Sequence, residues 1–199
     1  MKPLRSVPTP GDDDNARADL APAESVSEVQ VVIADECVYD PATDPEALLL
    51  CALMWSAQTG GVPTEDQRIT ETMTADDFDD VLYRRVFTVA ADLVAAGDPY
   101  DPASVSAAFM RSGSGGAKDA PLRRRLNEVI TAGASGAAAT HYADIVLSQA
   151  YRRSYRTVAA SIVQAAEELP EEYLFDHLVE YGRAQRALWQ RLNAFRGKQ

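Results

Sequence analysis

The last third of the sequence carries an apolar repeat of seven residues, and this repeat restricts the fold more than any other feature. Apolar side chains recur at alternating intervals of four and three residues over 151–169 and again over 174–195. Gln185 is the one polar amide in this series. This spacing places them along one face of a helix. Because Pro170 must interrupt a helix and the connection is short, the sequence predicts two helices folded back as an antiparallel hairpin.

Two helices cannot cover all the apolar side chains of this segment by themselves. Val163, Phe175 and Val179 are further apolar residues outside the repeat. We therefore expect the hairpin to pair with a second copy, as a homodimer or within a larger ring, and the alternative is that it packs on the rest of its own chain. The residues expected at this interface are Tyr155, Val158, Ile162, Leu174, Leu178, Tyr181, Leu188, Trp189, Leu192 and Phe195.

Proline, glycine and aspartate divide the middle of the chain into further helices. Asp44 and Pro45 have the form of an N-cap followed by the first helical residue, ahead of an apolar run to Trp55. The residues 74–77 have the form of a capping box ahead of a helix that ends at Gly97. The two Asp-Pro pairs at 98–99 and 101–102 then indicate a helix end and a helix start, rather than a pair of catalytic carboxylates.

The fold class predicted by these signals is all-α. A short polar helix is expected near residues 65–73, one from Pro102 to the glycine-rich loop 112–116, and one from Pro121 to Ile130. We expect a globular helical bundle over 44–140, followed by the antiparallel helical hairpin over 141–199. Residues 1–43 are rich in Pro, Asp, Ser and Ala and are predicted to form a disordered acidic tail. The β-prone run at 29–34 is interpreted as an edge strand, a linear motif or a locally packed linker.

Charge is unevenly distributed along the chain, whose net charge is −11. Residues 1–80 carry 18 acidic and 4 basic side chains, whereas residues 81–199 carry 12 acidic and 15 basic ones. The acidic half repels phosphate, so any contact with nucleic acid must come from the later segments. A nucleic-acid-binding adaptor is therefore an alternative function, and its contact residues would be Arg123, Arg124, Arg125, Arg152, Arg153 and Arg156.

Motifs for catalysis or cofactor binding are missing from the sequence. The loop around Lys118 lacks the Gly before and the Ser or Thr after the lysine of a Walker A motif. His141 and His177 are isolated, and Cys37 and Cys51 lie in unlike contexts, so we expect neither a metal site nor a disulfide, and Cys51 as a small core residue. We expect no cofactor, and an enzyme of unrecognised type is the least favoured alternative. No run is long enough to cross a membrane and no signal peptide is evident, which favours a cytoplasmic protein.

Three segments resemble the N-terminal collar domain of DnaB-family replicative DNA helicases. They are "DPEALLLCALM" at 44–54, "MTADDFDDVLYRRVFTVAADLVAAGDPYDPASV" at 73–105, and "GASGAAATHYADIV" at 133–146. The likeness covers about residues 44–195, and the middle segment is the most specific of the three. The matching positions are Phe78, Phe87, Gly97, Pro99, Asp101, Ser104, Val105, Tyr142, Ala143, Ile145 and Val146.

The resemblance implies a helical globular part followed by a hairpin. In that family the hairpins pair, the domains build a ring-like collar above the ATPase motor, and the collar docks primase and loading factors. This sequence departs from the pattern at Cys51, where the family usually has Gly, and at Ala134 and Ala138, which replace Pro and Asn. Because no Walker lysine or RecA-like domain is present, we expect no unwinding by this chain alone, whether it is a stand-alone homologue or the collar end of a longer helicase.

Overall fold

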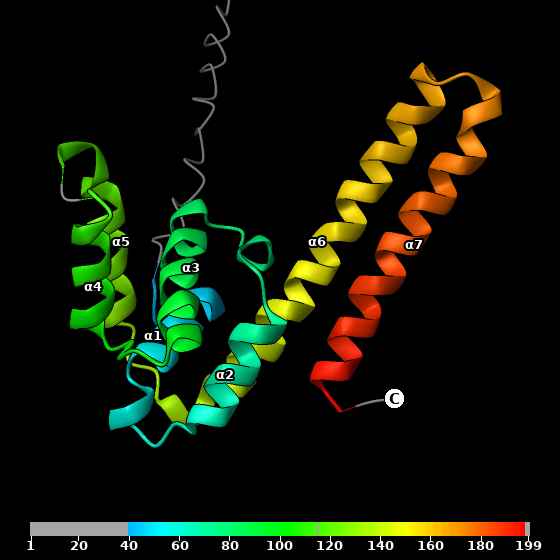
Figure 1. The fold of residues 1–199 in the computed structure, drawn as a ribbon. Coiled ribbons are helices and arrows are strands. Elements are labelled where there is room, and N and C mark those ends of the chain that lie inside the picture. The colour runs from blue at the N-terminus through cyan, green and yellow to red at the C-terminus, as the bar shows by residue number, and fades with distance from the viewer. Residues whose placement is uncertain (1–39, 115, 198–199) are drawn as a thin grey trace, which may run out of the picture. The chain divides into compact units, whose positions relative to one another are not determined.

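Helices account for all the regular structure in the part of the chain that the computed structural model describes, residues 40–114 and 116–197 (Figure 1). The predicted all-α fold, with a helical bundle followed by an antiparallel hairpin of α6 and α7, is confirmed. The acidic tail, its β-prone run and Cys37 lie outside the described residues. The α-helices are α1 (Pro45–Met54), α2 (Pro63–Thr72), α3 (Val81–Ala96), α4 (Pro102–Arg111), α5 (Ala120–Ile130), α6 (Ala139–Glu168) and α7 (Glu171–Phe195), and the short 3-10 turns are η1 (Ser56–Gln58), η2 (Ala75–Asp77), η3 (Ala117–Asp119) and η4 (Gly136–Ala138).

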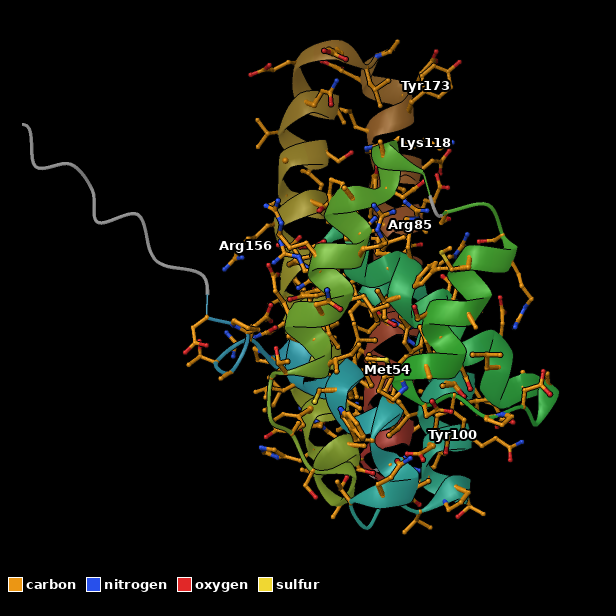
Figure 2. All side chains as sticks on the ribbon, turned by 90° about the vertical axis from the view of Figure 1, so that its left-hand side faces the viewer. Met54, Arg85, Tyr100, Lys118, Arg156 and Tyr173 are labelled. Atoms are coloured by element: carbon orange, nitrogen blue, oxygen red, sulfur yellow. The ribbon has the colours of Figure 1, made fainter. Side chains whose placement is uncertain are left out.

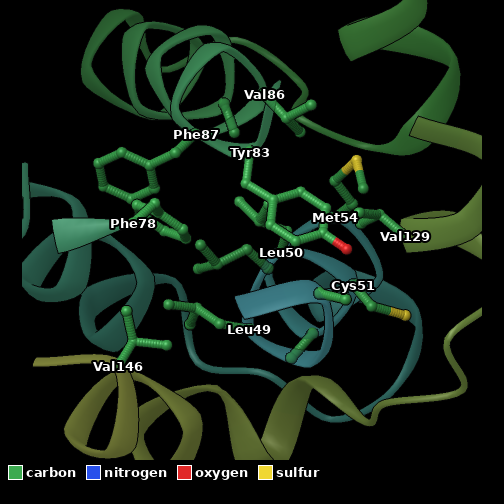
Figure 3. Close-up of a cluster of buried hydrophobic side chains, with 14 of the residues drawn as sticks. Leu49, Leu50, Cys51, Met54, Phe78, Tyr83, Val86, Phe87, Val129 and Val146 are labelled. Atoms are coloured by element: carbon green, nitrogen blue, oxygen red, sulfur yellow. The ribbon is translucent and has the colours of Figure 1, made fainter. Parts of the chain in front are cut away.

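Helix α1 forms the centre of the core. Its residues are buried on every side, as expected for a helix whose sequence is apolar almost throughout. It contacts α3, α5 and the first half of α6, which contributes Ala143, Val146 and Leu147 to the same core. Figure 3 shows Leu49 and Leu50 of α1 packed against core side chains of the surrounding segments. The first half of α6 is therefore part of the globular core. The division of the chain into a globular part over 44–140 and a hairpin over 141–199 stays a prediction.

The helix ends follow the local signals in the sequence at most positions. The Asp44 carboxylate accepts a hydrogen bond from the Glu46 N–H at 2.9 Å, and Asp101 caps α4 through the N–H groups of Ala103 and Ser104. Gly97 ends α3 in the left-handed conformation with φ 71°. These local contacts account for the boundaries of the helices at both Asp-Pro pairs.

The capping box at 74–77 is present, but it does not start the long helix. Thr74 and Asp77 close the 3-10 turn η2, while α3 begins at Val81 with Asp80 as its N-cap. The physical reason is Phe78, which is fully buried and extended, so its insertion into the core ends the turn before α3 can begin.

A close backbone contact fixes the start of α6 on the turn after α1. A Cβ atom added to Gly136 would lie 2.6 Å from the Cα atom of Ser56, so only glycine fits there. The Gly136 N–H donates to the Thr59 hydroxyl at 2.6 Å, and the Ser135 hydroxyl donates to the Thr59 carbonyl at 2.8 Å. The turn and η4 therefore form one joint, from which α6 starts.

We predict that Gly136→Ala destabilises the fold by about 1–3 kcal/mol, because the added methyl group forces two backbone segments apart. The matched control is Gly116→Ala, where an added Cβ meets only a lysine side-chain atom at 3.9 Å and is expected to change stability by less than about 0.5 kcal/mol. Urea denaturation measures both. Equal stabilities for the two variants would show that the joint adapts to the methyl group.

Candidate functional site

Helices α6 and α7 meet along a seam that is marked by two hydrogen bonds. The Ser154 hydroxyl donates to the Gln185 side chain at 3.1 Å, and the hydroxyl groups of Ser161 and Tyr181 share a hydrogen bond of 2.6 Å. Leu174 and Leu188 lie seven residues on either side of Tyr181, and hence on the same face of α7. One set of apolar positions, which includes Leu174, Tyr181 and Leu188, therefore packs in the seam between the two helices of the hairpin.

A second set of apolar side chains remains open to solvent on one face of the hairpin. Tyr155 is 53% exposed, Leu178 51%, Trp189 52% and Phe175 72%. Three of them, Tyr155, Leu178 and Trp189, line a groove between α6 and α7 together with Gly182. The described residues leave this groove uncovered, so its apolar side chains form an exposed apolar patch.

The structure divides the ten predicted interface residues into three groups. The open group has large exposed fractions, the seam group is half-buried, and the third group is buried in the globular core of the same chain. The open residues are Tyr155, Ile162, Leu178 and Trp189, the half-buried residues are Val158, Leu174, Tyr181 and Leu188, and the core residues are Leu192 and Phe195.

Charge is segregated along the hairpin. Residues 157–182, which include the turn, contain six carboxylates and neither lysine nor arginine. The base, residues 144–156 and 183–197, contains seven arginines and one carboxylate, Asp144. Figure 2 shows Tyr173 near the turn and Arg156 farther toward the base. The acidic residues near the turn are Glu167, Glu168, Glu171, Glu172, Asp176 and Glu180, and the basic residues of the base are Arg152, Arg153, Arg156, Arg183, Arg186, Arg191 and Arg196.

Two of the base arginines attach the hairpin to buried carboxylates of the globular part. Arg153 of α6 lies 3.3 Å from Glu46 and also donates to the Asp77 carbonyl, while Arg191 of α7 pairs with the Asp77 carboxylate. Glu46 is 4% exposed and Asp77 is 2% exposed. The guanidinium groups of both hairpin helices thus converge on η2. Sequence reasoning missed these contacts because the two ion pairs, Arg153–Glu46 and Arg191–Asp77, join residues more than 100 positions apart.

Burial is the main influence on the Glu46 carboxyl, where the hairpin meets the globular part. Glu46 accepts hydrogen bonds from the N–H groups of Asp79 and Asp80, at 2.7 and 3.3 Å. Burial raises the pKa of the Glu46 carboxyl above its ordinary value of 4.5, although these N–H groups and Arg153 act in the opposite direction. Its neighbour Asp44 has a raised pKa for the same reason.

The predicted arginine clusters do not form one continuous basic surface. Arg125 pairs with Asp80 at 2.8 Å and with Glu128 at 2.7 Å, and Arg123 donates to the Gly116 carbonyl. Arg153 is held by its contacts with Glu46 and Asp77. Arg152 and Arg156 are exposed, form no ion pair with the described residues, and line a groove with Tyr151, Tyr155 and Trp189, while Arg124 is exposed on α5.

Within the described residues, no group of His, Cys, Asp or Glu side chains is arranged to hold a metal ion. His141 is exposed, and His177 packs edge-on against Tyr181 in the seam. Cys51 is buried in the core, as predicted. Nor does any helix of this part of the chain combine the length and apolar character needed to cross a bilayer.

Comparison with known proteins identifies the architecture. The family model described as "DnaB-like helicase N terminal domain" matches residues 41–148. The chain belongs to this family. The N-terminal domain is the non-catalytic part of DnaB helicases, and the chain is a collar-like domain of that type. No curated protein matches the sequence.

Solved structures show the same fold. Eleven chains match, and one is the crystal structure of the N-terminal domain of DnaB helicase from Mycobacterium tuberculosis. The two folds superpose with a TM-score of 0.59 at 20% sequence identity, over 71% of this chain and 94% of that chain. The predicted resemblance to the DnaB N-terminal domain is therefore confirmed.

The raised pKa of Glu46 predicts a pH dependence of stability. The folded state binds the Glu46 proton more tightly than the unfolded state, so the stabilising contribution is fully present below about pH 4.5 and is lost as the pH rises through the raised pKa. We expect the free energy of unfolding of the wild type, relative to Glu46→Gln, to increase as the pH falls from about 7.5 to about 5. Urea denaturation at several pH values measures this difference.

The control for this experiment is Glu71→Gln, which removes an exposed carboxylate of α2. A Glu46→Gln difference that is constant with pH, or that moves in the opposite direction, would contradict the assigned role of burial at Glu46.

Proposed function

We propose that this domain is an interaction and oligomerisation module of bacterial DNA replication, which assembles by pairing of its hairpins. The observation that carries the proposal is the uncovered apolar face formed by Tyr155, Ile162, Leu178 and Trp189. Membership of the DnaB N-terminal family supports it. The domain has no catalytic role in this proposal and acts in the cytoplasm, as the non-catalytic collar of a replicative helicase or a homologue of it.

The charge segregation favours an antiparallel pair, in which the turn of each hairpin lies on the base of the other. A parallel pair would place six carboxylates beside six more, whereas the antiparallel pair brings them to exposed base arginines such as Arg152 and Arg156. A two-fold axis makes the same favourable contact twice. The apolar face then supplies affinity, and the charges select the direction of pairing.

We predict that Leu178→Asp raises the dissociation constant of the pair at least about a hundredfold, because the substitution places a carboxylate in the apolar groove. Sedimentation equilibrium over a wide concentration range measures the mass. The matched control is Val81→Asp, which changes an exposed valine at the start of α3 and is expected to leave the mass unchanged. A Leu178→Asp variant that still pairs would remove the groove from the proposal.

We further propose that the paired domain docks primase or a helicase loader. Family membership supports this role, and in this proposal the globular part (44–140) carries the docking surface of a domain that is paired through its hairpin (141–199). Leu178→Asp and Val81→Asp also test this step, since docking that requires the pair is lost in the first variant and kept in the second.

The second candidate function is binding of single-stranded nucleic acid at the hairpin base. The groove that joins exposed Arg152 and Arg156 to Tyr151, Tyr155 and Trp189 favours it, because guanidinium groups contact phosphates and aromatic rings stack on bases.

This candidate predicts binding that weakens steeply between about 50 and about 200 mM salt. Combined Arg152→Ala and Arg156→Ala substitutions should abolish it, while Arg183→Ala, outside the groove, should not. Fluorescence anisotropy with a labelled oligonucleotide measures both effects. Absence of binding at low salt would eliminate this function.

A further inference from the structure

Gly182 lies at a position where neither the packing of the described residues nor the backbone conformation requires a glycine. It lies in the middle of the 25-residue helix α7, where glycine is among the least favourable residues. Apart from its chain neighbours and the nearby backbone of α7 itself, no described atom lies within 4 Å of the position that its Cβ atom would occupy, and its φ angle is not positive. Neither close packing against the other described residues nor backbone geometry therefore requires glycine here.

The surroundings of Gly182 indicate a contact from outside the chain. It lies in the apolar groove beside Leu178 and Trp189. Phe175 precedes it by seven residues and Trp189 follows it by seven, so all three share one face of α7. Both aromatic side chains are more than half exposed. A small residue thus lies midway between two large apolar side chains that the described residues leave uncovered.

Resting on the proposed antiparallel pairing, we propose that the two-fold axis of the pair passes beside Gly182, where α7 of one copy crosses α7 of the second copy. Glycine lets the two helix backbones approach closely at the crossing point. A two-fold axis at this residue places Phe175 of each copy opposite Trp189 of the other, because each lies seven residues from the axis. The two most exposed aromatic positions on this face of α7 then cover each other.

The charges of α6 agree with this register. The hydrogen bonds Ser154–Gln185 and Ser161–Tyr181 place Ala159 of α6 at about the level of Gly182. Ala159 is small and exposed, so it also permits close approach. Arg152 lies seven residues before Ala159 and Glu167 eight residues after it, so the same axis brings Arg152 of one copy to within about one residue of the level of Glu167 of the other. One axis therefore brings the exposed aromatic residues of the two copies together and also places opposite charges near each other.

The direct test is disulfide cross-linking of the full chain. In a Cys37→Ser background, where the remaining Cys51 is buried, Gly182→Cys places one thiol beside the axis in each copy. Disulfides join cysteines whose Cα atoms lie about 4.4–6.8 Å apart, a separation that closely crossing helices provide. We expect a covalent dimer under mild oxidation at low protein concentration. The matched control is Ala187→Cys, at an exposed position on the other side of α7, and is expected to stay monomeric on a non-reducing gel.

A second pair of variants tests the need for close approach. Gly182→Leu should raise the dissociation constant of the pair at least about tenfold, because the side chain separates the two helices. Ala187→Leu adds the same side chain away from the axis and should leave the mass unchanged. Circular dichroism checks that both variants keep their helices.

The outcomes distinguish this inference from the proposed function. Cross-linking at residue 182 with loss of pairing in Gly182→Leu supports the axis. A wild type that pairs, with no cross-link at residue 182 and full pairing in Gly182→Leu, overturns the axis while the pairing surface stands. A wild type that stays monomeric at every concentration overturns the pairing itself and the axis with it.

Discussion

Two buried carboxylates at the base of the hairpin fix how the hairpin leaves the globular part. Glu46 and Asp77 are desolvated in the core, so each needs a cation, and each receives a guanidinium group from a different hairpin helix, Arg153 from α6 and Arg191 from α7. Helix α6 is already fixed by its apolar first half in the core. The pair between Arg191 and Asp77 then fixes α7, and together these contacts decide which face of the hairpin stays open.

Local chemistry explains why so much of the fold could be predicted. Asp44 with Pro45, Gly97, Asp101 with Pro102 and Pro170 act within a few residues of themselves, and each coincides with a helix boundary. The heptad spacing predicted the hairpin because the chain turns at Pro170 and each helix keeps one apolar stripe. The capping box at 74–77 was assigned to the wrong helix start, since burial of Phe78 decided the boundary over the local pattern.

The candidate site was harder to predict because periodicity shows which side chains share a helix face and not what covers them. Leu178, Leu188 and Leu192 belong to one heptad series, yet they are exposed, half-buried in the seam and buried in the core, respectively. Arg153 shows the same limit, because its sequence neighbours suggest a basic patch while its side chain pairs with Glu46. Contacts between distant segments decide these cases, and a helical pattern does not encode them.

Family membership and the pairing surface rest on different parts of the chain. The family match ends at residue 148, before Tyr155, Leu178, Gly182 and Trp189, so what these residues do depends on their own chemistry. At physiological ionic strength the Debye length is about 8 Å, and the charges of the turn and base act mainly on partners in contact. The apolar face alone would permit either direction of pairing. In the proposed pair, repulsion between two acidic turns opposes the parallel arrangement, so the separation of charge along the hairpin favours the antiparallel one.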